Sequence, residues 1–60
     1  MFIVRFIRRD RHPNEEYYYN TIEEARWHLN LFREDDSGLY ERVVLIDMNH
    51  SEVPIDVIEF

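Results

Sequence analysis

Apolar residues recur with two different periods along this chain, and each period predicts one kind of element. In residues 2–9 they alternate between two faces, which is typical of a β-strand. One face carries Phe2, Val4 and Phe6, and the other carries Ile3 and Ile7. After turn residues at 13–14, residues 16–20 read EYYYN, and this aromatic run favours a second strand that forms a hairpin with the first.

A helical period follows. Thr21 is a favourable N-cap residue, and Glu24 completes a T-x-x-E capping box. The apolar residues at helical spacing then form one stripe, which consists of Ile22, Ala25, Leu29 and Phe32. Because the aspartates at 35–36 are unfavourable beside the negative end of a helix, we expect the helix to end near residues 33–34, with Gly38 as a candidate cap.

Two more strands are predicted after the helix. Residues 39–48 are apolar on both faces and contain two adjacent β-branched valines. Residues 53–60 form the last strand, and Pro54 places it at a sheet edge because proline cannot donate a ladder hydrogen bond. The order β-β-α-β-β predicts a single α+β domain over residues 1–60, with one helix packed on a four-stranded, mainly antiparallel sheet in spatial order 2-1-3-4.

The pattern leaves a surplus of apolar side chains. One helix can cover one face of such a sheet, yet apolar residues also occupy the second sheet face and the outer side of the helix, opposite the buried stripe. The candidate interface residues on these surfaces are Trp27, Leu31, Ile3, Ile7, Val44, Ile46 and Met48. Because large exposed apolar patches mark interfaces, we expect a homodimer that packs helix to helix or sheet to sheet.

A monomer is the alternative interpretation. Scattered exposed apolar residues are ordinary on folded proteins, and Trp27 could fold back over residues 17–19. A chain of 60 residues has marginal stability by itself and commonly needs a disulfide, a metal or a partner. The absence of cysteine excludes disulfides and thiolate metal sites, and it is typical of a reducing compartment.

Charge is distributed unevenly along the chain, whose formal net charge is −6. Residues 1–12 hold four arginines and one acid, whereas residues 13–60 hold three arginines and twelve acids. An acidic total disfavours general binding to nucleic acid. It also permits a role as an acidic inhibitor that occupies a basic partner protein, which we keep as one alternative function.

The basic first strand leaves a second alternative open. Arginines beside exposed aromatic rings can hold single-stranded nucleic acid by phosphate contact and stacking. The residues that would do so are Arg5, Arg8, Arg9 and Arg11, with the tyrosines at 17–19 alongside. The competing interpretation is that these arginines form ion pairs with Glu15, Glu16 or Glu59 on neighbouring strands.

The sequence contains no recognisable catalytic or metal-binding motif. The acids Glu34, Asp35, Asp36 and Glu41 do not match the spacing of a calcium loop, and the histidines His12, His28 and His50 do not form a zinc-protease motif. A single glycine allows no phosphate-binding loop or nucleophile elbow, and both serines lie in predicted turns. We therefore expect no enzymatic activity, cofactor or metal.

The first ten residues lack the features of a signal peptide, and no apolar run approaches the roughly 18 residues of a membrane helix. We therefore expect a cytoplasmic protein without membrane association.

One segment resembles a known group of proteins. The run NTIEEARWHLNLFREDDSGLYERVVLI, residues 20–46, is similar to small uncharacterised bacterial proteins in which a strand pair precedes a T-x-E-E-A helix, an LF…DDS…LY exit and a β-hairpin. The resemblance covers about residues 17–48. It implies the β-β-α-β-β order, a bacterial origin and an association with conjugative or phage-like elements, and it implies no catalytic residue. Together with the apolar surplus, it leads us to expect a non-enzymatic protein–protein interaction module that associates with itself.

Overall fold

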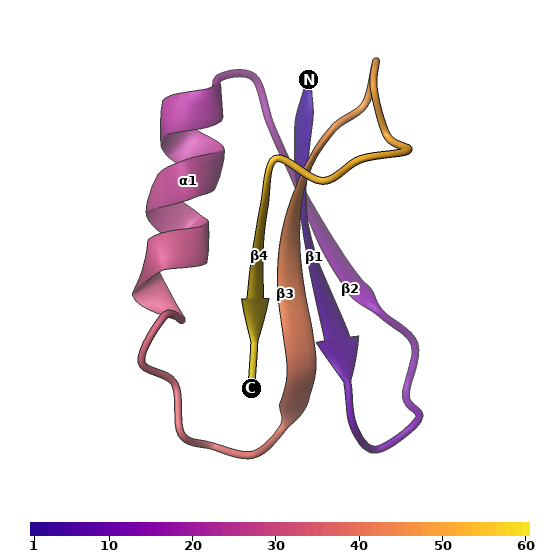
Figure 1. Cartoon of the computed structure of the whole chain (residues 1–60), viewed down its shortest axis with the longest axis vertical. Helices are drawn as coiled ribbons and strands as arrows, with labels where there is room; N and C mark the ends of the chain where they lie inside the picture. Colours follow the sequence, from indigo (N-terminus) through magenta and orange to yellow (C-terminus); the bar gives the residue numbers. More distant parts are fainter.

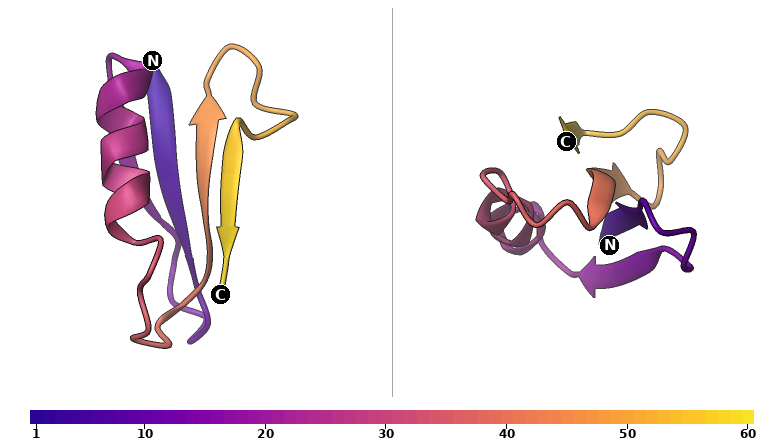
Figure 2. Two further views of the ribbon diagram at one scale, coloured as in Figure 1. Left: turned by 60° about the vertical axis from the view of Figure 1, so that its left-hand side comes forward. Right: turned by 90° about the horizontal axis from the view of Figure 1, so that it is seen from below.

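The computed structural model describes all 60 residues and contains one helix packed on one four-stranded antiparallel sheet (Figure 1). The elements are β1 (Phe2–Arg8), β2 (Glu15–Tyr19), α1 (Ile22–Leu31), β3 (Tyr40–Asp47) and β4 (Asp56–Glu59). The strand order β2-β1-β3-β4 confirms the predicted spatial order and the α+β class. Figure 2 shows from two directions that α1 lies on one side of the sheet only.

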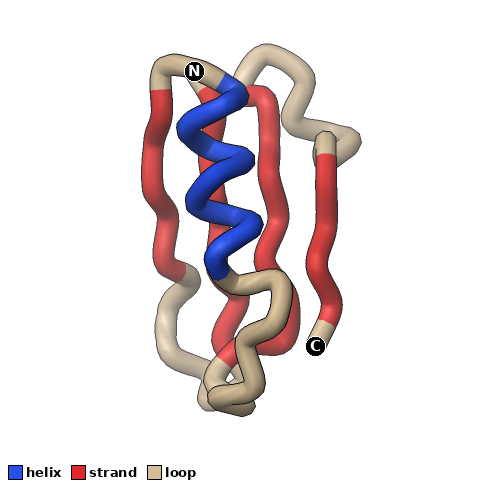
Figure 3. The backbone as a smooth tube through the Cα atoms, turned by 90° about the vertical axis from the view of Figure 1, so that its left-hand side faces the viewer, coloured by secondary structure: helices blue, strands red, loops and turns tan.

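The chain passes from β2 through α1 to β3 and crosses over β1 on the way. Because β1 is antiparallel to both β2 and β3, those two strands run parallel to each other, and parallel strands need a crossover of this kind. In Figure 3, α1 lies in front of β1, with β2 and β3 on either side, and β4 lies farther from the helix at the edge of the sheet.

The hydrophobic core fills the space between α1 and the inner face of the sheet. Its buried members come from β1, α1, β3 and β4, and they are Val4, Phe6, Ala25, Leu29, Val43, Leu45 and Ile58. The ring of Phe6 lies at its centre, with ring centroids of Phe32 at 4.8 Å and Tyr40 at 5.1 Å. The predicted helical stripe is confirmed, since Ala25 and Leu29 are fully buried and the other two members pack against the same core.

The helix begins where the sequence predicts and ends earlier. Thr21 is the N-cap, and its hydroxyl accepts a hydrogen bond of 3.2 Å from the backbone N–H of Glu24. The last helical residue is Leu31, so the predicted end near residues 33–34 is wrong. From Phe32 onward the backbone N–H groups bond three residues back instead of four, which tightens the chain into turns. Gly38 has a positive φ of 75° and lies in the exit loop, so it does not cap the helix.

The last strand is at an edge, as predicted, but it begins at Asp56 instead of residue 53. Pro54 has no N–H, and the first backbone bond to β3 in this segment comes from Ile55, whose N–H donates to the carbonyl of Leu45 at 2.8 Å. Val53 is 69% exposed. The residues before Asp56 therefore belong to the loop from β3 to β4.

Candidate functional site

The outer face of α1 carries two large apolar side chains that are mostly exposed to solvent. Trp27 is 64% exposed and Leu31 is 59% exposed, although the opposite side of the same helix is fully buried. The two residues are four positions apart and therefore lie on one face of the helix. The fold thus leaves Trp27 in solvent, and the alternative in which it folds back over residues 17–19 as core is wrong.

A shallow depression lies beside Trp27, where the first turn of α1 meets the end of β2. Its volume is about 340 Å³, and the residues that line it are Tyr19, Glu23, Glu24 and Trp27. Sequence reasoning identified Trp27 and missed the two glutamates as parts of a site. The spacing contains the signal, since positions 23 and 24 precede Trp27 by four and three residues and share its side of the helix.

Tyr19, one wall of the depression, is held in place from behind by His28. The Tyr19 hydroxyl and His28 Nδ1 are hydrogen-bonded at 2.7 Å. The imidazole also packs against the rings of Tyr17, Phe6 and Phe32, with centroids 4.9–5.8 Å away. This position between the sheet and the helix lowers the pKa of His28, because burial disfavours the charged form.

We expect acid to destabilise the fold between about pH 7 and pH 5 because of His28. Its pKa is lowered in the folded state, so the unfolded chain binds the proton more readily once the pH falls through the ordinary histidine value of about 6.5. The stability that neutral His28 contributes is complete above that pH and is lost below it. Urea unfolding at both ends of the range measures the change in midpoint.

The variant His28→Gln is the control for this pH effect, because it removes the titrating group and keeps a polar side chain at the position. The carboxylates with lowered pKa values, Asp10, Glu16 and Asp47, stay ionised in the same range and do not contribute. An equal pH dependence in His28→Gln would contradict the assignment.

The second face of the sheet is better covered than the sequence suggests. Ile3, Val44 and Ile46 form a small buried cluster there and are only 5–8% exposed. Neighbouring side chains on the same face account for this, because Tyr18 and Ile46 flank Ile3 on the adjacent strands, and Arg5 lies beside Val44. The expectation that a single chain leaves this face exposed to solvent is therefore wrong for these three residues. Of the other candidates, Ile7 is half-buried and Met48 is exposed in the turn after β3.

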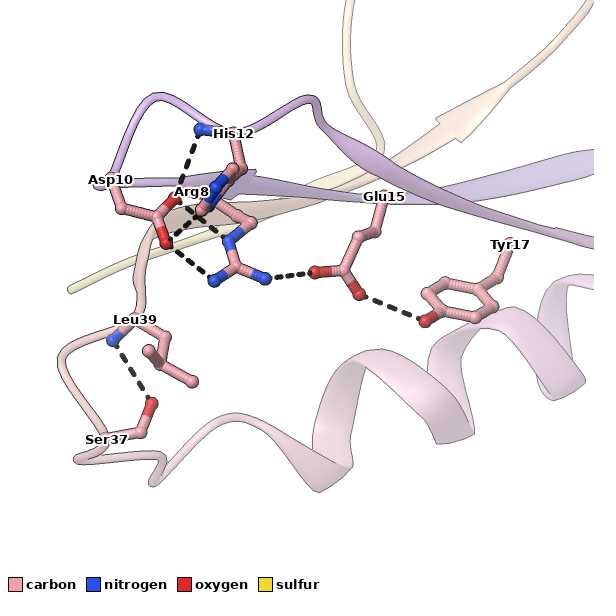
Figure 4. Close-up of polar contacts among 7 residues, drawn as sticks. All are labelled: Arg8, Asp10, His12, Glu15, Tyr17, Ser37 and Leu39. Atoms are coloured by element: carbon pink, nitrogen blue, oxygen red, sulfur yellow. Dashed lines mark hydrogen bonds and ion pairs between the residues drawn. The ribbon is translucent and has the colours of Figure 1, made fainter.

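The arginines of the first strand and its following turn are largely engaged within the chain. Arg5 pairs with Glu16. Arg8 pairs with Asp10 at 2.6 Å and with Glu15 at 3.2 Å (Figure 4). The hydrogen bond from Arg8, with a second from His12, holds the pKa of Asp10 well below its usual range.

Arg9 instead donates to backbone carbonyls, those of Tyr40 at 3.0 Å and Phe60 at 2.6 Å. The predicted pairing with Glu15 and Glu16 is confirmed, whereas Glu59 lies 3.9 Å from Arg42 on β3. Among the four candidate arginines, Arg11 alone has no such contact; it lies exposed in the turn with a φ of 65°.

Among the acidic residues after the helix, Asp35 is the one whose side chain bonds within its own loop. Asp35 accepts hydrogen bonds from the backbone N–H and the hydroxyl of Ser37, at 3.3 Å and 2.6 Å, and so shapes the exit loop. No three histidine, aspartate or glutamate side chains are gathered in a way that could hold a metal ion. The single helix has neither the length nor the apolar character to span a membrane.

Comparisons with known proteins give no match: no family model, no curated protein and no solved structure corresponds to this chain. The site is therefore described by its own geometry: an exposed tryptophan and leucine on one helix face, beside a mainly apolar depression that is lined by two aromatic and two glutamate side chains.

Proposed function

We propose that the protein is a non-enzymatic interaction module that binds other proteins through the outer face of α1, beginning with a second copy of itself. The observation that carries the proposal is the exposure of Trp27 and Leu31, 64% and 59%, on a helix whose other side is buried. Tryptophan is the residue type most often found as an energetic anchor of protein interfaces.

The helix face is a better candidate for self-association than the second sheet face. Ile3, Val44 and Ile46 are already shielded within one chain, so a partner that covered them would remove little further apolar surface from water. Trp27 and Leu31 have most of their surface left to bury. A two-fold axis near Trp27 would place the two helices side by side and bring each indole against its counterpart.

The negative charge of the chain opposes self-association and should make it depend on the salt concentration. Each chain carries a net charge of −6, and Glu23 and Glu24 lie on the contact face, so two copies repel each other at low ionic strength. Added salt screens this repulsion. Self-association should therefore become stronger as the salt concentration rises.

We expect Trp27→Ala to weaken self-association by at least about tenfold, because a truncated aromatic anchor costs about 2 kcal/mol or more. The fold should remain intact, because the Trp27 side chain is not part of the hydrophobic core. Sedimentation equilibrium over a range of protein concentrations measures the association constant, and circular dichroism checks the fold.

Met48→Ala serves as the matched control, because Met48 is 47% exposed in the turn after β3 and lies away from the helix. A wild-type chain that stays monomeric at high concentration and high salt would contradict the proposal. So would a Trp27→Ala variant that associates as the wild type does.

Nucleic-acid binding is less well supported. Three of the four candidate arginines, Arg5, Arg8 and Arg9, already have partners within the chain. A phosphate would have to replace those contacts on a protein of net charge −6. The proposed setting is the bacterial cytoplasm. This compartment is reducing, and a chain without cysteine does not depend on disulfide formation.

A further inference from the structure

The depression beside Trp27 has the composition of a cation-binding site. Its surface is almost wholly apolar: Tyr19 and Trp27 offer aromatic rings, and Glu23 and Glu24 line it mainly with the apolar parts of their side chains and carry their carboxylates beside it. A cation near an aromatic face is attracted by the negative potential of the ring. A carboxylate accepts charge-assisted hydrogen bonds from the same cation. No basic side chain lines the depression.

The walls are positioned before any ligand arrives. The Thr21 hydroxyl donates to Oε1 of Glu24 at 3.0 Å and accepts from the Glu24 backbone N–H at 3.2 Å, so the N-cap holds this carboxylate at the rim. Tyr19 is fixed by its hydrogen bond to His28. The positive end of the helix amounts to about half a charge, which two full negative charges exceed, so the depression stays electronegative.

Five of the seven arginines of the chain have partners away from the depression. Arg5, Arg8 and Arg42 pair with acids on the sheet or in the following turn, and Arg9 holds two backbone carbonyls. Arg33, at the far end of the helix, pairs with Asp56 at 2.9 Å. Arg26 lies on α1 but is not a lining residue. The acidic and aromatic walls therefore have no basic partner within the fold.

We infer that this depression receives the cationic side chain of an arginine or lysine from a basic segment of a partner protein. The inference rests on the proposed role of the outer face of α1 as a binding surface, and it adds the chemistry of the partner. The rest of the surface favours the same partner, since a net charge of −6 attracts basic segments over a distance. Leu31, further along the same face, would contact an apolar residue of that segment.

Trp27 gives a direct readout, because it is the only tryptophan of the chain. The probes are capped tetrapeptides of arginine, of lysine and of glutamate, added at low salt to protein that sedimentation shows to be monomeric. We expect a saturable change of Trp27 fluorescence with the arginine and lysine peptides and none with the glutamate peptide. Added salt should weaken this binding, whereas it strengthens self-association.

A pair of matched double variants tests the location of the site. Glu23→Gln with Glu24→Gln removes both carboxylates, keeps the capping-box geometry, and should weaken peptide binding by about tenfold. Glu41→Gln with Glu52→Gln removes the same charge from exposed positions away from the helix, and we expect a change of less than about twofold. Circular dichroism confirms that each variant is folded.

The result that would overturn the inference is either no saturable response of the wild type or equal weakening in both double variants. The variant Leu31→Ser distinguishes a failure of this inference, which concerns peptide binding, from a failure of the proposed function, which concerns self-association. That variant should lose self-association and keep the fluorescence response to the arginine peptide, because Leu31 does not line the depression. Loss of the two carboxylates should act the other way. It should weaken peptide binding, and at high salt, where the repulsion between copies is screened, it should not weaken self-association.

Discussion

Replacing Phe6 by alanine should unfold most of the protein at room temperature. The Phe6 side chain is 1% exposed, and its ring contacts rings from β2, α1, the helix C-cap Phe32 and β3 at centroid distances of 4.8–5.6 Å. Removal of a buried phenylalanine costs about 3–5 kcal/mol, because apolar contacts are lost and a cavity remains. A domain of this size has a free energy of unfolding of about the same magnitude, so little stability would be left.

Circular dichroism and urea unfolding measure this effect. Leu39→Ala is the control, because Leu39 is 46% exposed in the exit loop and its side chain lies outside the core. A Phe6→Ala variant with the urea midpoint of the wild type would show that the aromatic cluster is not the centre of the core.

The pair Leu29→Ala and Leu31→Ala should separate stability from association. Leu29 is fully buried against the sheet, so its truncation should lower the free energy of unfolding by about 2–5 kcal/mol. Leu31 is 59% exposed, so the same substitution two positions later should change it by less than about 0.5 kcal/mol. Both variants keep alanine's favourable helix propensity, so the comparison isolates burial.

The effect on self-association should be the reverse of the effect on stability. Leu31→Ala should weaken self-association in sedimentation equilibrium while the urea midpoint, measured at a concentration where the chain is monomeric, stays unchanged. Equal losses of stability in the two variants would mean that Leu31 belongs to the core in solution. Equal association of Leu31→Ala and the wild type would remove this residue from the proposed contact face.

The sequence predicts the fold because its two hydrophobic periods are clear. Alternation in residues 2–9 and the stripe that includes Ala25 and Leu29 each match a buried face. The exposure of Trp27 follows from the same reasoning, since a residue opposite the buried stripe of a single helix has nothing to pack against. Element ends are predicted less well, because they depend on which backbone carbonyl each N–H finds, as at Phe32.

Burial on the second sheet face could not be read from the pattern. Ile3 is shielded because Tyr18 and Ile46 stand beside it on neighbouring strands, and that depends on strand register. The depression beside Trp27 was missed for a related reason. Tyr19 reaches it from another element, and its placement depends on the turn into the helix and on the hydrogen bond to His28.

The partners of the arginines were predicted only as alternatives. Charge pattern alone allows Arg5 either to face solvent and bind phosphate or to pair across the sheet. The register places Glu16 directly opposite Arg5, and this decides in favour of the pair.

Arg9 affects how firmly the edge strand β4 is attached to the sheet. Strand β4 pairs with β3 alone, so the separation of β4 would expose the backbone edge of β3. A bare, β-branched strand is a template on which other chains can grow into fibrils. The guanidinium of Arg9 donates to the carbonyl of Tyr40, the first residue of β3, and to that of Phe60, just after β4. These two hydrogen bonds join the ends of the strands and oppose the separation of β4 from β3.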